Sequence, residues 1–335
     1  MRIAIVLSSL GQGGLERHVV DLAHALSDKH QVFVVADAGF AGKLRAPVVH
    51  IPFSARFWRL NPFALWQLRR ILQTIRPDVI HAQANKAAAM CRAARVSAPV
   101  RVATVHNIKS NVRAFAGYDG IIAVSKATAQ QLPYPCVTVI PNGIEPLAPM
   151  AEQTVSALRQ QWCPDGAPLT VAIGRLVHAK GFDVLLRAWQ DLPGTLLIVG
   201  AGPDEHKLKA LQTQLGLRNR VVFTGFRHDV MALMAAADLL VISSRREGFP
   251  YVLVEALHVG VPVVSTRIPG AADFLPADAV VATEDVAALH AVLRSKLQQH
   301  ELLREQYKPW FDRARSQLTL AHMTEETERF YQSLC

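Results

Sequence analysis

Short β-branched runs alternate with segments of helical periodicity along the chain, and this alternation constrains the fold more than any other feature. The first series comprises RIAIVLSS, QVFVVAD, DVIHAQ, VRVATVH, GIIAVS and CVTVIPN, with a helical segment from about Leu15 to Leu26 after the first run. The rhythm restarts after Pro146 with LTVAIGR, TLLIVGAG, VVFTGF, LLVISS and VPVVST. Strands that alternate with helices form parallel sheets, so the sequence predicts an α/β fold with two doubly wound domains.

The length of the chain agrees with two domains, because 335 residues exceed what one hydrophobic core usually organises. We expect an N-terminal domain over residues 1–148, a second domain over 149–310 and a C-terminal helix over 311–335. A return of that helix to the first domain is one alternative. The breaks and polar residues from Gly143 to about Gln161 predict a hinge between the domains.

The positive charge is concentrated in the first part of the chain. Residues 1–150 contain 17 Lys and Arg against 7 Asp and Glu, whereas the remainder contains 19 against 20. Such an excess draws a domain to anionic lipid, nucleic acid or a phosphorylated substrate. The sequence contains no recognised nucleic-acid-binding module, so nucleic acid is not an expected partner.

Targeting and cysteine signals are weak in this sequence. The run RIAIVLSSL is short and is followed at once by Gly-Gln-Gly-Gly, and no later stretch is long and apolar enough to cross a membrane. We therefore expect a cytoplasmic protein. The four cysteines are scattered without a C-x-x-C pair, which predicts neither a disulfide framework nor a zinc site.

Ligands of doubly wound folds bind outside the carboxyl ends of the strands, so residues that follow the predicted strands are candidates for chemistry. After the first strand, Gly11, Gly13 and Gly14 allow close approach of a ligand, and the next helix offers its N-terminal amides to a phosphate. A plain tight turn is the alternative. His106 follows a predicted strand of the first domain. Its imidazole could there hydrogen-bond a sugar hydroxyl or transfer a proton, and a purely structural histidine is the alternative.

Two cations and two carboxylates follow strands of the second domain. Arg175 and Lys180 share one loop and can together hold a diphosphate, the arginine as a planar fork and the lysine as a point charge. A solvated pair of loop residues is the alternative. Glu247 lies in a loop, and Glu255 lies one turn inside the helix that begins near Tyr251. These carboxylates either accept hydrogen bonds from the hydroxyls of a sugar and a ribose or face solvent.

In this order, the motifs resemble those of the family four retaining glycosyltransferases of the bacterial lipopolysaccharide and polysaccharide type. Glu247 and Glu255 match the E-x7-E motif of that family, and GQGG, VIPNGI, GRLVHAKG, VGAGP and VVFTGF extend the resemblance over most of the chain. The resemblance implies a GT-B fold, in which an acceptor-binding and a nucleotide-sugar-binding Rossmann-like domain face a central cleft. It implies front-face transfer of a hexose from a nucleotide diphosphate sugar, with a UDP-sugar favoured, to a glycan or lipid-linked acceptor. It also implies that no metal ion and no cofactor are needed.

The resemblance assigns roles to individual residues. The catalytic residues that it implies are His106, Arg175, Lys180 and Glu247. The expected donor contacts are Gly13, Gly14, Arg175, Lys180, Gly202, Phe226, Arg227, Glu247, Gly248, Phe249, Tyr251, Leu253 and Glu255. In this assignment Glu255 holds the ribose, and Phe226 borders the base. The chain departs from the family at PGAAD, where many members have Gly-Gly-x-x-Glu, and at Pro250, which has no amide hydrogen to donate.

The segment from Phe53 to Leu72, FSARFWRLNPFALWQLRRIL, interleaves aromatic residues with four arginines. Aromatic rings beside arginines suit a membrane interface. Together with the basic first domain, this pattern favours a peripheral enzyme on the inner face of the cytoplasmic membrane that reaches a lipid-linked or phosphorylated acceptor. A partly buried helix with one solvated face is the alternative.

Other functions stay open on the residues alone. A nucleotide-sugar epimerase or a glycan phosphorylase shares the two-domain architecture. A NAD-dependent oxidoreductase would explain Gly11 and Gly13, although Glu16 stands at the third glycine position of the dinucleotide fingerprint. A non-enzymatic membrane-binding protein would explain the basic domain but gives no role to the cations and carboxylates of the second domain.

Overall fold

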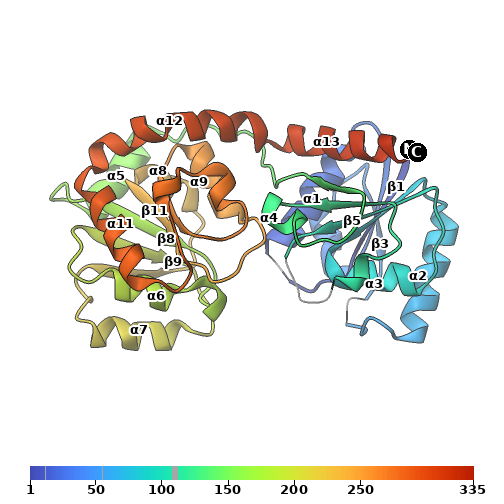
Figure 1. The fold of residues 1–335 in the computed structure, drawn as a ribbon, viewed down its shortest axis with the longest axis horizontal. Coiled ribbons are helices and arrows are strands. Elements are labelled where there is room, and N and C mark those ends of the chain that lie inside the picture. Colours follow the sequence, from blue (N-terminus) through green and yellow to red (C-terminus); the bar gives the residue numbers. More distant parts are fainter. Residues whose placement is uncertain (12, 55, 108–111) are drawn as a thin grey trace. The chain divides into compact units, whose positions relative to one another are not determined.

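The computed structural model describes residues 1–11, 13–54, 56–107 and 112–335. The chain divides into two compact units: unit 1 comprises Met1–Glu145 and Leu318–Cys335, and unit 2 comprises Pro146–Gln317. Each unit contains one sheet in which the neighbouring strands pair in parallel, and helices cover both faces (Figure 1). This architecture confirms the predicted α/β class with two doubly wound sheets.

Unit 1 has a seven-stranded sheet in the order β3-β2-β1-β4-β5-β6-β7. Its strands are β1 (Arg2–Leu7), β2 (Gln31–Ala36), β3 (Val49–Pro52), β4 (Val79–Gln83), β5 (Val100–Val105), β6 (Gly120–Ala123) and β7 (Val137–Val139). Its α-helices are α1 (Gly14–Ser27), α2 (Pro62–Ile75), α3 (Ala84–Ala93), α4 (Lys126–Ala129) and α13 (Leu320–Ser333), and its 3-10 helices are η1 (Ala38–Lys43) and η2 (Arg113–Phe115).

The sheet of unit 1 carries a hydrophobic core on each face, because successive strand residues point to opposite sides. Ile3 and Ile5 of β1 belong to the core that includes α1 and α13, whereas Ala4 and Val6 belong to the core that includes α2 and α3. A strand buried on both faces needs a continuous apolar run, which explains RIAIVL in β1. Tyr331 of α13 is completely buried, so the end of the chain completes the core of unit 1.

Unit 2 has a six-stranded sheet in the order β10-β9-β8-β11-β12-β13. Its strands are β8 (Leu169–Ile173), β9 (Thr195–Val199), β10 (Val221–Gly225), β11 (Leu239–Ile242), β12 (Val263–Thr266) and β13 (Val280–Val281). Its α-helices are α5 (Glu152–Trp162), α6 (Phe182–Ala188), α7 (Glu205–Gln214), α8 (Val230–Ala236), α9 (Tyr251–Val259), α10 (Ala271–Phe274), α11 (Val286–Gln298) and α12 (His300–Gln317), and its 3-10 helices are η3 (His178–Lys180) and η4 (Ala277–Ala279).

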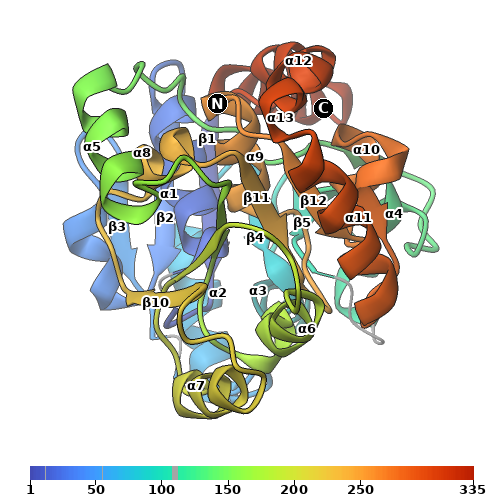
Figure 2. The same ribbon diagram turned by 90° about the vertical axis from the view of Figure 1, so that its left-hand side faces the viewer.

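The helices of unit 2 form two packed groups, as expected when crossovers run in both directions from the middle of a sheet (Figure 2). In one group α6 packs against α7 and α11, and in the other α8 packs against α5 and α9. The second half of the predicted hinge is therefore a structured helix of unit 2, α5, and not a linker. Its half-buried face against α8 explains why a polar-looking stretch folds there.

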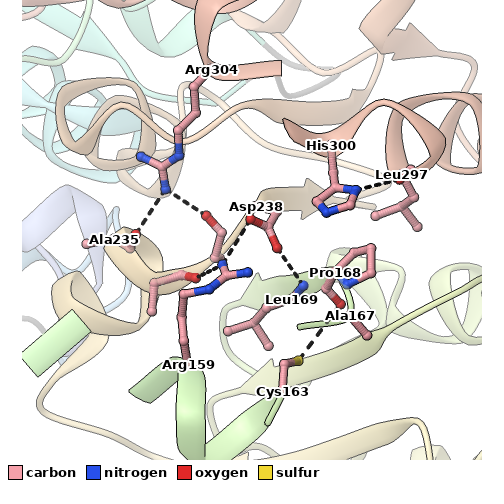
Figure 3. Close-up of polar contacts among 12 residues, drawn as sticks. Arg159, Cys163, Ala167, Pro168, Leu169, Ala235, Asp238, Leu297, His300 and Arg304 are labelled. Atoms are coloured by element: carbon pink, nitrogen blue, oxygen red, sulfur yellow. Dashed lines mark hydrogen bonds and ion pairs between the residues drawn. The ribbon is translucent and has the colours of Figure 1, made fainter. Parts of the chain in front are cut away.

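A polar network joins the helices of unit 2 to the amino ends of β8 and β11 (Figure 3). Arg159 of α5 donates to Asp238 Oδ1 (2.9 Å) and to the carbonyl of Ala236 (2.8 Å), and Asp238 Oδ2 accepts from the amide of Leu169 (2.8 Å). Arg304 of α12 donates to the carbonyls of Ala235 and Ala237 (3.0 and 2.9 Å). These bonds satisfy carbonyls at the end of α8, and they lie at the opposite end of the strands from the predicted site.

The cysteines and the helices agree with the absence of disulfide and membrane-spanning signals in the sequence. Cys91, Cys136, Cys163 and Cys335 are all free thiols. In the part of the chain that the structure describes, no helix is both long and apolar enough to cross a bilayer.

Candidate functional site

The predicted site residues gather where each sheet changes the direction of its crossovers, which is where doubly wound folds bind ligands. This switch lies between β1 and β4 in unit 1 and between β8 and β11 in unit 2. Arg175 and Lys180 follow β8, and Glu247 follows β11, so the switch of unit 2 brings these three residues to one edge of the sheet. His106 follows β5, the neighbour of β4 in unit 1.

Lys180 and Glu247 form an ion pair at the switch of unit 2. Both side chains are partly buried, and Ser244 Oγ donates to the same carboxylate oxygen of Glu247 at 3.0 Å. The aliphatic part of Lys180 lies along Gly174, where a Cβ would be 3.4 Å from it. A ligand therefore meets a lysine whose charge is already shared with a carboxylate, an arrangement that the spacing in the sequence does not reveal.

Arg175 is the more available cation of this loop. It is exposed directly after β8, and no residue in the described ranges binds its guanidinium. A guanidinium offers five N–H donors in a planar fork that matches phosphate geometry. Arg175 can therefore bind an anion without breaking an existing ion pair.

Arg245 ties the loop after β11 to the loop after β8. Its guanidinium binds Asp183 through two bonds of 2.7 Å and donates to the carbonyl of His178 at 2.9 Å. Its own amide donates to the carbonyl of Ala179 at 2.9 Å, and Ser243 Oγ donates to the carbonyl of Lys180 at 3.0 Å. The hydrogen bonds from Arg245 lower the pKa of the Asp183 carboxyl. Arg245 thus fixes the loop that contains Glu247 against the loop that contains Lys180.

The residues around α9 are more buried than a ligand-lining role would require. Leu253 is fully buried, and Phe249 packs edge-on against Phe274 with 5.7 Å between ring centroids. A donor contact of Leu253 or Phe249 would therefore have to come from the backbone. Glu255 is 8% exposed and lies in the second turn of α9, so its carboxylate is inside the unit and does not face bulk solvent.

The loops after β9 and β10 divide into a packed loop and an open one. Gly202 packs its backbone on the loop after β8, because a Cβ there would clash with the carbonyl of Leu176. Phe226 is 72% exposed directly after β10, and its ring contacts that of His228 at 4.9 Å between centroids in a T-shaped arrangement. Arg227 forms two bonds to Asp229, of 2.7 and 2.6 Å. Only Phe226 of these three residues is both exposed and apolar, as a contact with a base requires.

In unit 1, the carboxylate of Glu16 already binds the glycine turn that follows β1. Glu16 Oε2 accepts from the amide of Gly13 at 2.7 Å, and Ser9 donates to the other carboxylate oxygen. This capping box places a carboxylate at the N-terminus of α1, where a phosphate would otherwise benefit from the helix dipole. A diphosphate near Gly13 and Gly14 would meet that carboxylate, so the phosphate role of the two glycines stays a prediction.

His106 is held by a neighbour that the sequence analysis did not select. Its Nε2 lies 2.7 Å from Gln83 Oε1, an acceptor, so Nε2 carries the proton and Nδ1 is the acceptor of the ring. The ring of His18 meets that of His106 edge to face at 4.6 Å, and His18 Nδ1 donates to Asn142 Oδ1 at 3.0 Å. His106 can thus accept a hydrogen bond from a sugar hydroxyl as a neutral imidazole.

A third histidine connects this group to the last helix. Tyr331 of α13 donates to His81 Nδ1 at 2.6 Å, and His81 Nε2 donates to Thr104 Oγ1 at 2.6 Å. The amide nitrogen of Gln83 lies 3.2 and 3.4 Å from the two ring nitrogens of His81. The amide of Gln83 therefore lies between His81 and His106. Helix α13 therefore supports a buried polar group that also includes residues of β4 and β5.

Burial of these histidines makes the stability of unit 1 sensitive to acid. Burial lowers the pKa of His18 to about 4 and that of His81 to about 3, and it lowers the pKa of His106 well below its usual value. A lowered folded-state pKa means that the unfolded chain binds protons first as the pH falls. Stability is therefore complete above about pH 6.5 and is lost toward about pH 4, by about 3 kcal/mol from His18 alone.

We expect the thermal unfolding temperature of unit 1 to fall steeply as the pH drops from about 6.5 to about 4, and less steeply in a His18→Gln variant. The matched control is His206→Gln, because His206 is exposed and should leave the pH dependence of the wild type unchanged. An unfolding temperature that stays constant across this range in the wild type would show that these histidines are not held neutral by burial.

Several residues of the site were missed at the sequence level. Gln83 ends β4 at the switch of unit 1, so its position after a strand was a usable signal. Arg245 and Ser244 lie beside Glu247 in the same loop and could have been selected by position. Tyr331 and Asp183 carry no such signal, because their partners lie far away in the sequence.

Two protein-family profiles match the chain in succession. The profile described as Glycosyltransferase Family 4 matches residues 12–146, and the profile described as Glycosyl transferases group 1 matches residues 156–310. The first match lies in unit 1 except for its last residue, Pro146, and contains His106. The second match lies in unit 2 and contains Arg175, Lys180 and Glu247.

Individual relatives extend this similarity. The chain is 27% identical over 270 residues to the lipopolysaccharide core biosynthesis glycosyltransferase LpsD of Rhizobium meliloti (strain 1021), covering 77% of this chain and 76% of the relative. It is 29% identical over 317 residues to a GDP-mannose-dependent alpha-mannosyltransferase of Mycobacterium tuberculosis (strain CDC 1551 / Oshkosh). This match covers 82% of this chain and 81% of the relative. The crystal structure of Anabaena Alr3699/HepE in complex with UDP-glucose superposes with a TM-score of 0.83 at 26% identity, covering 99% of this chain and 100% of that one. These matches confirm the GT-B fold that the motifs implied.

Proposed function

The chain belongs to the family four glycosyltransferases, and from this membership we propose that it is a retaining enzyme that transfers a hexose from a nucleotide diphosphate sugar. A UDP-sugar is the favoured donor, and a glycan or lipid-linked molecule of the cell envelope is the acceptor. Similarity to LpsD supports a role in lipopolysaccharide or polysaccharide synthesis. The observation that supports the proposal is that Arg175 and the Lys180–Glu247 ion pair follow the neighbouring strands β8 and β11 at the switch of unit 2.

The cations of this site suit a diphosphate leaving group. In the proposed reaction the bond between the anomeric carbon and the diphosphate oxygen breaks, and the acceptor oxygen bonds to that carbon on the same face. The acceptor proton passes to the leaving phosphate oxygen. Arg175 and Lys180 would stabilise the negative charge that develops on the diphosphate, which is where transition-state binding is most effective. The proposal therefore needs no metal ion and no cofactor.

The remaining contacts of the donor follow from exposure and chemistry. Glu247 would accept from hydroxyls of the transferred sugar while it holds Lys180, and Glu255 would accept from the ribose. Phe226 would stack on the base, since it is the exposed ring after β10. In unit 1, the acceptor nitrogen of His106 would bind a sugar hydroxyl. The enzyme would work at the inner face of the cytoplasmic membrane, where a lipid-linked acceptor is found.

Donor hydrolysis in the absence of acceptor tests this proposal. The protein is incubated separately with UDP-glucose, UDP-galactose, GDP-mannose and ADP-glucose, with and without EDTA, and proton NMR follows the released sugar. We expect one donor class to release its sugar with the α configuration first, at a rate that EDTA does not change. Release of the β anomer would contradict the retaining mechanism, and loss of release in EDTA would contradict metal independence.

A further inference from the structure

A row of aromatic side chains on unit 1 is exposed where burial would be expected. Trp58, Phe63 and Trp66 are 64%, 59% and 55% exposed. Phe63 stacks on Trp66 with 6.0 Å between ring centroids, and the Arg70 guanidinium lies 5.5 Å from the centroid of Trp66. The aromatic–arginine surface, as we name it, comprises Arg56, Trp58, Arg59, Phe63, Trp66, Arg69 and Arg70.

The fold of unit 1 does not require these rings. Helix α2 already buries one apolar stripe against the sheet, formed by Ala64, Leu68, Leu72 and Ile75. The opposite face of such a helix is normally polar, and contiguous apolar side chains on it mark a surface that contacts another apolar phase. The exposed rings are therefore a feature of binding rather than of folding.

Charge identifies the kind of partner. The sequence contains no Asp or Glu between Asp37 and Asp78, and this interval contains 7 Lys and Arg. Unit 1 as a whole contains 18 Lys and Arg against 10 Asp and Glu. A second copy of the chain bound symmetrically through this surface would place arginines against arginines. An anionic bilayer instead offers phosphates to the arginines and an interfacial zone to the tryptophans.

The surface adjoins the candidate site of unit 1. The segment with Trp58 and Arg59 connects the carboxyl end of β3 to the first turn of α2. Arg59 Nη1 lies 3.5 Å from Asn85 Oδ1 at the start of α3. Asn85 is two residues beyond Gln83, whose side chain accepts from His106. A molecule anchored in a bilayer under the aromatic rings would thus reach the edge that carries His106.

We propose that the aromatic–arginine surface docks on an anionic lipid bilayer, with Trp58, Phe63 and Trp66 in the interfacial zone and the arginines on lipid phosphates. This inference rests on the proposed function for its consequence: the acceptor is lipid-linked and enters unit 1 from the membrane. The docking itself depends only on the surface.

Vesicle sedimentation tests the docking. The full-length protein is mixed with vesicles of phosphatidylcholine alone or of phosphatidylcholine with phosphatidylglycerol, at low and at high salt. We expect binding to the anionic vesicles at low salt and release at high salt.

The double variant Phe63→Gln/Trp66→Gln should bind about tenfold more weakly. The double variant Arg69→Gln/Arg70→Gln should bind the anionic vesicles about fivefold more weakly for each arginine removed. The controls Leu302→Gln and Arg294→Gln change exposed residues of unit 2 and should bind like the wild type.

The outcomes separate this inference from the proposed function. UDP binding by the Phe63→Gln/Trp66→Gln variant should equal that of the wild type, since these residues lie in unit 1 and the donor contacts of the diphosphate lie in unit 2. If the wild-type protein does not bind anionic vesicles at low salt, the docking proposal is wrong, even if UDP still binds. A wild-type dimer in sedimentation velocity that this variant abolishes would overturn it in favour of a second copy.

Discussion

Replacing Arg175 by alanine is expected to lower turnover by about 10²–10³-fold while the protein stays folded. Its guanidinium is exposed and has no partner within the described ranges, so its removal breaks no bond of the folded state. In the proposed reaction the same group stabilises charge on the leaving diphosphate. Steady-state kinetics with the donor identified by hydrolysis and a thermal unfolding scan measure the two effects separately.

Arg218→Ala is the matched control for this variant, because Arg218 is an exposed arginine of the same unit outside the site. It should match the wild type in both measurements. If Arg175→Ala keeps wild-type turnover, the diphosphate does not bind at this loop. If Arg175→Ala fails to fold, the guanidinium stabilises the folded state. That result would contradict the exposed position described above.

A Glu247→Gln variant is expected to lose about 10²-fold in turnover yet to bind UDP at least as tightly as the wild type. The amide can still accept from Ser244, but it no longer shares the charge of Lys180. Lys180 would then be fully available to the diphosphate, whereas the transferred sugar would lose a charged acceptor. Turnover and UDP titration by calorimetry give the two quantities.

Opposite effects on turnover and on UDP binding are the signature of a residue that serves the sugar rather than the phosphates. Glu305→Gln removes an exposed carboxylate from α12 and should change neither quantity. A Glu247→Gln variant that loses UDP affinity in proportion to turnover would contradict the assignment and place Glu247 on the nucleotide.

Regular elements were predictable from the sequence because each is specified locally. The helical pattern after Tyr251 and the apolar runs of β1 and β8 were recognised within a few residues of their bounds. Strand β3 was missed because VHIP is short and ends in proline at Pro52. Helix α5 was included in the predicted hinge because the stretch contains prolines and many polar residues, although its end has a helical pattern. Only Leu158 of this helix is buried, so the sequence lacks a clear apolar stripe.

The candidate site was predictable only where position after a strand was sufficient. Arg175, Lys180, Glu247 and His106 all lie at carboxyl ends, as the strand pattern indicated. The pairing of Lys180 with Glu247 depends on the packing of two loops that are 67 residues apart in the sequence. Such pairings depend on tertiary structure, and no local pattern encodes them.

Whether a site residue is buried also depends on tertiary packing and could not be predicted from the motifs. The family resemblance implied Leu253 as a donor contact, yet its side chain is fully buried in unit 2. It also offered Gly13 to a phosphate, whereas the carboxylate of Glu16 occupies that amide. In both cases the surrounding packing, which no short motif encodes, determines what a ligand could contact.

Thermal unfolding with UDP, GDP, ADP and NAD in turn tests the central claim most directly, because a ligand bound only by the folded protein stabilises it by about 2.7 kcal/mol at a hundredfold excess over its dissociation constant. We predict a raised unfolding temperature with UDP, a much smaller shift in the Arg175→Ala variant, and no shift with NAD. A shift with NAD alone, or none with any nucleoside diphosphate, would contradict a nucleotide-sugar site at the switch of unit 2.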